Sequence, residues 1–129
     1  MPHDSAGLAG RPLVQVAVTV RDMDRARTFY RDVLSLSLMF EVPGMMFFQL
    51  GNARLLVGRE VKEGTPIGGG VLYFDAPDLD ALGSALEAKG VAFTGPATVV
   101  QRTETHELKL REFFDPDGNA LALMGMIAR

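Results

Sequence analysis

Hydrophobic and polar positions follow two different periods along this chain, and the change between them predicts its elements. Over residues 13–20 apolar side chains alternate with smaller or polar ones, which is the period of a β-strand with unlike faces. After Asp22 the apolar positions recur every three or four residues as far as Leu34, as on the buried stripe of an amphipathic helix capped by Asp22. A second helix of this kind is expected over 79–89, capped by Asp78.

The same order of elements is written twice in the chain. The segment VAVTVRDMD at 16–24 returns 56 positions later as LYFDAPDLD at 72–80, and GNARLL at 51–56 returns as GNALAL at 118–123. Three short strands follow each helix, separated by turns that contain glycine or proline. These strands are expected near 36–42, 45–50, 53–59, 91–98, 104–114 and 119–126. We therefore predict an α+β fold of two βαβββ modules that curve around a shared cavity.

The pattern also sets the expected boundaries of the domain. Residues 1–12 are rich in glycine, proline and small side chains, so we expect a flexible tail. Residues 13–129 then form a single domain, because 129 residues with 47% hydrophobic side chains suffice for one packed core. Within it we expect module one at 13–60, a glycine-rich linker at 61–70 and module two at 71–127.

Composition and charge exclude several classes of function. The chain has no cysteine, so it forms no disulfide, no thiolate zinc site and no thiol nucleophile. Its net charge of −3 argues against a nucleic-acid groove, which depends on clustered lysine and arginine. The first twelve residues contain no apolar run, so we expect neither a signal peptide nor a membrane anchor and predict a cytoplasmic protein.

Three segments in this order resemble a known family, the vicinal oxygen chelate superfamily of glyoxalases, extradiol dioxygenases and bleomycin-resistance proteins. They are VRD at 20–22, FYRDVL at 29–34 and DPDGN at 115–119. The resemblance implies an incompletely closed, eight-stranded mixed sheet around a central cavity, and commonly a homodimer. It also implies four metal-ligand positions, which fall at Gln15, Leu55, Val71 and Ala122. Only Gln15 offers an oxygen, so we predict no metal cofactor at these positions.

Strand parity predicts which side chains face the cavity, because residues two apart share a face. This face combines small side chains, hydrocarbons, one amide and one phenol, as in a pocket for a small organic molecule. An alternative is that these side chains simply fill the space between the modules. The expected ligand-binding residues are Gln15, Ala17, Thr19, Leu55, Val57, Val71, Tyr73, Ala122 and Met124.

His106 is the only histidine beyond the tail, and its side chain suits proton transfer near neutral pH. The preferred hypothesis is a small-molecule binding protein without the usual metal ligands. The alternative is a lyase, isomerase or dioxygenase of the same superfamily. It would use either a divalent metal displaced to His106 and Glu112, or metal-free acid–base chemistry at His106 and Tyr73. The other interpretation of His106 is a strand residue held by a local hydrogen bond.

Overall fold

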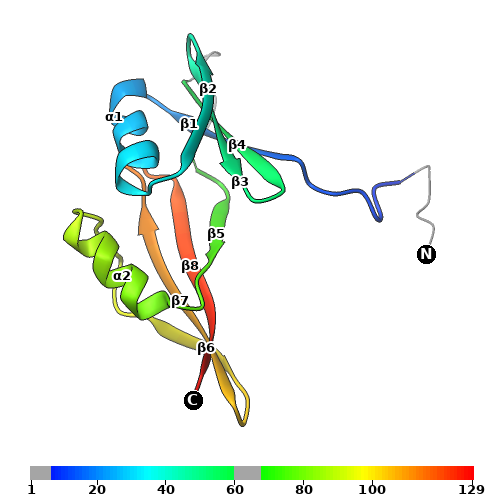
Figure 1. Cartoon of the computed structure of the whole chain (residues 1–129), viewed down its shortest axis with the longest axis vertical. Helices are drawn as coiled ribbons and strands as arrows, with labels where there is room; N and C mark the ends of the chain where they lie inside the picture. Colours follow the sequence, from blue (N-terminus) through cyan, green and yellow to red (C-terminus); the bar gives the residue numbers. More distant parts are fainter. Residues whose placement is uncertain (1–6, 60–67) are drawn as a thin grey trace.

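The computed structural model describes residues 7–59 and 68–129, which form two modules of related architecture (Figure 1). Each contains a first strand, a helical segment and three further strands, as predicted. The first module comprises β1 (Gln15–Val20), α1 (Met23–Arg27), the π-helical segment η1 (Thr28–Val33), β2 (Ser37–Val42), β3 (Met45–Leu50) and β4 (Ala53–Arg59). The second comprises β5 (Val71–Asp75), α2 (Leu79–Ala88), β6 (Thr98–Arg102), β7 (His106–Phe114) and β8 (Ala120–Ala128).

The eight strands are divided into two four-stranded mixed sheets, in the orders β1-β4-β3-β2 and β5-β8-β7-β6. In each sheet the first strand of the module pairs in parallel with the last, and the other pairs are antiparallel. The predicted α+β fold of two βαβββ modules is therefore confirmed, and the sheets form no closed barrel. The predicted linker at 61–70 lies mainly outside the described residues, which resume at Gly68.

The first helix begins where the sequence predicts, because Asp22 Oδ1 accepts the backbone N–H of Arg25 at 3.0 Å. Its continuation as η1 places two consecutive aromatic side chains, Phe29 and Tyr30, in the core. The second helix differs from the prediction at its start, since Asp78 occupies the N-cap position without a side-chain cap hydrogen bond. Within the described residues, no helix is long and apolar enough to cross a membrane.

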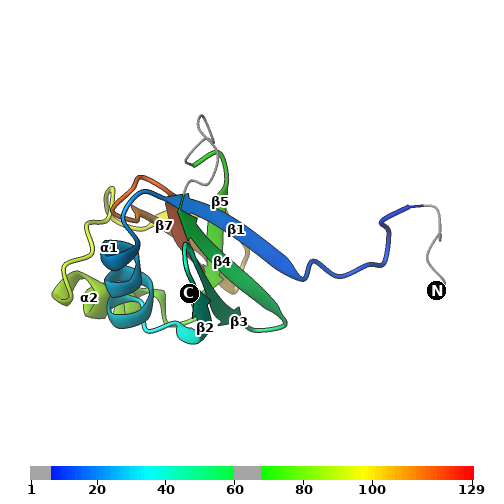
Figure 2. The same cartoon turned by 90° about the horizontal axis from the view of Figure 1, so that it is seen from above.

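One hydrophobic core serves both modules. Both views of the chain place α1 and α2 on the same side of the sheets (Figures 1 and 2). Phe29 from the first module and Phe113 from the second are in contact there, with ring centroids 6.4 Å apart. The largest fully buried side chains come from both halves and include Tyr30, Met46, Phe48, Leu55, Leu79, Phe113 and Leu121.

The prediction of a strand over 91–98 is wrong, because β6 covers Thr98–Arg102 instead. Residues 91–97 cross toward the core and make a single bridge, from Phe93 to Phe113. The ring of Phe93 packs edge-on against Phe113 at 5.2 Å, and Val91 is buried. The apolar residues that suggested a strand therefore fill the core beneath α2 rather than pair with a neighbouring strand.

Candidate functional site

The side of each sheet that faces away from the helices, which we call its free face, carries most of the predicted site. Residues paired in adjacent strands point to the same face, so the strand register assigns these faces directly. On the first sheet the free face includes Gln15, Ala17, Thr19, Phe40, Phe47, Gln49, Arg54 and Leu56. On the second it includes Val71, Tyr73, His106, Leu110, Glu112, Ala122 and Met124.

Two predicted cavity residues, Leu55 and Val57, lie on the opposite face. They pair with Val16 and Val18, are fully buried and belong to the core beneath the helices. The prediction failed because it aligned the two closing strands through their Gly-Asn pairs. Val16 pairs with Leu55 and its counterpart Leu72 pairs with Leu121, so the structural alignment is shifted by one residue. Such a shift moves every side chain to the other face.

The structure does not bring His106 and Glu112 together. They share a face of β7 but are six residues apart, which is about 20 Å along an extended strand. The His106 ring is held locally instead, with Nδ1 2.8 Å from Thr105 Oγ1, and its backbone N–H donates to Thr103 Oγ1. A metal held jointly by His106 and Glu112 is therefore excluded by this geometry. Tyr73, Ala122 and Glu112 do form one row across three strands.

In the described part of the chain, two clefts lie where β5 approaches β1 and the turn at Gly51. The smaller, about 180 Å³, separates the edges of β1 and β5 and is lined by Ala17, Thr19, Val71 and neighbouring residues. The larger, about 500 Å³, is open to solvent and is lined by Val71, Tyr73 and the turn at Gly51, among others. Its size is within the range of small-molecule sites.

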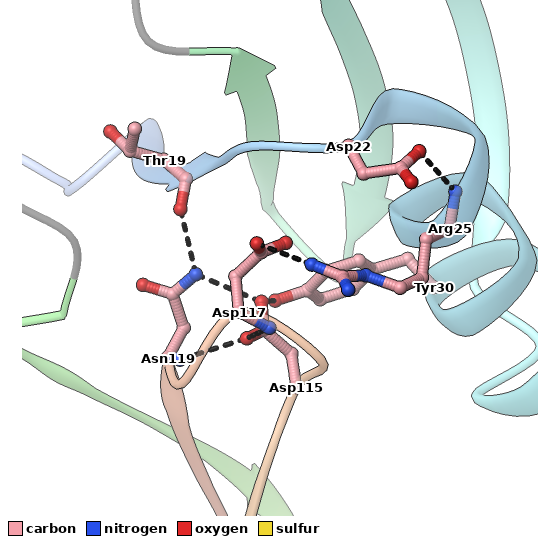
Figure 3. A network of polar contacts seen from close by, with 7 residues as sticks. All are labelled: Thr19, Asp22, Arg25, Tyr30, Asp115, Asp117 and Asn119. Carbon is pink, nitrogen blue, oxygen red and sulfur yellow. Dashed lines mark hydrogen bonds and ion pairs between the residues drawn. The ribbon is translucent and has the colours of Figure 1, made fainter.

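A buried polar network fixes the two sheets relative to each other at one end of these clefts (Figure 3). Asp115 accepts hydrogen bonds from the Tyr30 hydroxyl at 2.8 Å, from the Asn119 amide, and from the backbone N–H groups of Asp117 and Asn119. The Asn119 amide also donates to the Thr19 carbonyl at the end of β1. The Asp115 carboxylate thus holds the DPDGN turn through the backbone N–H groups of Asp117 and Asn119.

Burial and the adjacent Asp115 carboxylate raise the pKa of Tyr30 far above its usual value. Its phenol therefore stays protonated and acts as a fixed hydrogen-bond donor. Arg25 closes the network from outside with an ion pair to Asp117 at 2.7 Å. These contacts were missed in the sequence because they join residues roughly ninety positions apart, although both FYRDVL and DPDGN were singled out.

Arg54 is a functional candidate that the sequence pattern did not single out. It pairs with Gln15 across β1 and β4, and its Nε donates to Gln15 Oε1 at 2.6 Å. The guanidinium lies 5.0 Å from the centre of the Phe47 ring, on which Phe40 stacks at 4.4 Å. Correct alignment of the closing strands would have placed Arg54 beside Gln15 and revealed this pairing.

The residues present do not fit the metal site that the resemblance implied. The side-chain oxygen of Gln15 already accepts a hydrogen bond from Arg54, and Leu55 is in the core. The side chains of Val71 and Ala122 have no atom that could bind a metal ion. Leu56, which takes the free-face position that had been assigned to Leu55, is also a hydrocarbon. Across 7–59 and 68–129, no three histidine, cysteine, aspartate or glutamate side chains are grouped to hold a metal ion.

Comparisons with known proteins agree on the family. Residues 13–123 match the family described as the glyoxalase/bleomycin resistance protein/dioxygenase superfamily. Lactoylglutathione lyase from Agrobacterium tumefaciens has a similar structure, with a TM-score of 0.73 and 24% identity over 89% of this chain and 93% of that one. TnmS3, an antibiotic binding protein from Streptomyces sp. CB03234, gives a TM-score of 0.71 and 24% identity over 95% of this chain and 100% of that one. An integron cassette protein from the mobile metagenome of V. cholerae gives a TM-score of 0.71 and 21% identity over 88% of this chain and 94% of that one. None of the curated proteins matches the chain, and identities this low establish the fold alone.

Proposed function

Because this chain belongs to the glyoxalase/bleomycin resistance protein/dioxygenase superfamily, we propose that it is a small-molecule binding protein that works without the family's metal. The observation that carries this proposal is the replacement of the metal-ligand set. Three of its four positions are hydrocarbons, and the carbonyl oxygen of the fourth, Gln15, accepts from an arginine. Such a site lacks the ligands that a divalent ion needs but keeps orienting polar groups on an otherwise apolar surface.

The similarity to TnmS3 supports binding as a biological role for this architecture. The similarity to a lactoylglutathione lyase is equally strong, so the choice between binding and catalysis depends on the side chains. The residues we propose to contact ligand are Gln15, Ala17, Thr19, Val71, Tyr73 and Met124. Ala122, which was also expected to contact ligand, is on the same face but is fully buried. Leu56 takes the free-face position that had been assigned to Leu55.

Metal-free acid–base catalysis is the alternative that one observation favours. Tyr73 and Glu112 flank Ala122 in a single row on the free face of the second sheet, about 10 Å apart across two strand spacings. Ala122 itself is fully buried, so a substrate would contact the exposed side chains of Tyr73 and Glu112 above it. His106 is remote from this row, so Tyr73 and Glu112 would be the catalytic pair in such an enzyme.

The proposal is tested by presenting a panel of antibiotics and other small organic molecules to the protein with and without a chelator. We expect native mass spectrometry to detect a one-to-one complex that survives the chelator, and the ligand to be recovered chemically unchanged. Mn²⁺, Fe²⁺, Ni²⁺ and Zn²⁺ are expected to shift the melting temperature by less than about 1 °C, whereas a bound metal at 100 times its Kd would stabilise by about 2.7 kcal/mol. Stoichiometric metal or metal-independent turnover of the ligand would contradict the binding proposal.

We also propose that the protein is a homodimer, because the free faces leave large apolar side chains exposed. Phe40, Tyr73, Phe114 and Met126 are each about half exposed. Apolar surface of this extent on a free sheet face is typical of a protein–protein contact. Light scattering is expected to give a dimer, and Met126→Asp is expected to shift it toward monomer while Asp80→Ala, at an exposed position on α2, does not. A wild-type monomer at micromolar concentration would contradict this proposal.

A cytoplasmic location stays a prediction.

A further inference from the structure

From the free face of the first sheet we infer the class of ligand, an inference that rests on the proposed binding function. Two neighbouring rows of side chains carry it. Gln15 lies beside Arg54 in one row, and the next row contains Leu56, Phe47 and Phe40. Arg54 lies diagonally across from Phe47, with its guanidinium 5.0 Å from the ring centre. We propose that these two rows bind a small organic anion with a flat apolar body, such as an aromatic carboxylate. The acidic group is bound by Arg54, and the flat body lies against the two phenylalanines.

Two contacts hold the Arg54 guanidinium in one orientation. Its Nε donates to Gln15 Oε1, and its Cζ lies 5.0 Å from the centre of the Phe47 ring, within the range of a cation–π attraction. Within the described residues, Nη1 and Nη2 of Arg54 donate to no protein acceptor. Those two nitrogens present parallel N–H donors at the spacing of a carboxylate's two oxygens. The guanidinium is thus oriented for bidentate binding before any ligand arrives.

The position of this cation gives it a chemical role. The resemblance to the family puts Gln15 at a metal-ligand position, so the positive charge of a family member's metal ion would lie next to this side chain. Here Gln15 holds a guanidinium instead, and the site keeps a fixed positive charge without a metal ion. That charge favours ligands with an anionic oxygen over neutral molecules of the same shape.

The apolar side chains beside Arg54 favour a ligand with a flat body. Phe40 stacks on Phe47 with ring planes 21° apart, and Phe40 is 46% exposed while Phe47 is nearly buried. Leu56 pairs with Phe47 and extends the hydrocarbon surface beside Arg54. A flat aromatic ring covers such a surface at little cost in conformational entropy, whereas a flexible chain loses more freedom on binding.

The test compares 2-naphthoate with its neutral isostere 2-naphthamide by isothermal titration calorimetry, on the full chain. We expect the wild-type protein to bind the acid at least about tenfold more tightly than the amide, the value of one charge-assisted contact. Arg54→Gln is expected to remove this preference, and added salt to reduce it. Arg59→Gln is the matched control, because Arg59 is on the same strand but on its other face, and it should keep the preference. Phe40→Ala should weaken the binding of both compounds several-fold.

Failure of this inference can be distinguished from failure of the proposed function. If acid and amide bind equally to wild type, or if Arg54→Gln keeps the preference, the anion site is overturned while small-molecule binding stands. If neither compound binds and the wider panel gives only turnover or no complex, the inference and the proposed function both fall. Thermal unfolding of each variant checks that lost binding is not lost folding.

Discussion

Gly125→Ala is expected to destabilise the protein by more than about 4 kcal/mol, the largest effect of any single methyl group we anticipate. A Cβ built on Gly125 would lie 1.9 Å from the carbonyl oxygen of Ala76 and 2.8 Å from its carbonyl carbon. Both atoms belong to the backbone that leads from β5 into α2, and this segment is anchored to β8 by the hydrogen bond from Ala76 N to Met124 O. No rotation of a side chain relieves such a clash, so the crossover itself would have to move.

Urea unfolding followed by circular dichroism measures this effect, with Gly95→Ala as the matched control. A Cβ at Gly95 meets nothing within 4 Å, and the backbone conformation there does not require glycine. The stability of the Gly95→Ala variant should therefore change by no more than about 0.5 kcal/mol. If Gly125→Ala were as stable as Gly95→Ala, the close packing of the β5–α2 crossover on β8 would be wrong. Ligand binding at the free faces should be lost only in proportion to unfolding.

Asp115→Ala is expected to cost about 3 to 5 kcal/mol, because the carboxylate is the shared acceptor of the network between the sheets. Four donors lose their partner: the Tyr30 hydroxyl, the Asn119 amide and two backbone N–H groups. Buried donors left without acceptors each cost about 1 to 3 kcal/mol, although the turn relaxes and recovers part of this. The change should also raise hydrogen-exchange rates at the end of β1, since Asn119 would no longer hold the Thr19 carbonyl firmly.

Asp32→Ala is the control for this variant. Asp32 is exposed and, among the described residues, forms its ion pair with its neighbour Arg31, so its loss should change stability far less than the loss of Asp115. Tyr30→Phe provides a second measurement, because it removes one of the four donors and leaves the carboxylate in place. A cost for Tyr30→Phe close to that of Asp115→Ala would mean that the other three hydrogen bonds contribute little.

The sequence was sufficient for features that local chemistry determines. The Asp22 cap and the alternation of every strand except β6 depend on residues within a few positions of each other, and these were predicted. The internal repeat added the expectation that both modules share one order of elements, which the structure confirms. The parallel pairing of the first and last strands of each module was not predicted. Together these signals define a βαβββ module without any knowledge of how two modules pack.

Longer-range features were missed for physical reasons. Residues 91–97 have the apolar content of a strand, but whether such a segment pairs or packs depends on the neighbouring Phe113 ring. The faces of Leu55 and Val57 depend on a register shift of one residue, which the Gly-Asn echo concealed. Arg54 became a candidate only when that register was known, because its neighbours on the free face come from β1 and β3.

The shared core has a consequence for either module taken alone. Phe29 and Phe113, two aromatic rings in contact across the module boundary, belong to different halves of the chain. A module separated from its partner would expose this apolar surface to water, and a single sheet with one helix offers little else to cover it. Neither half of the chain is therefore expected to fold stably without the other.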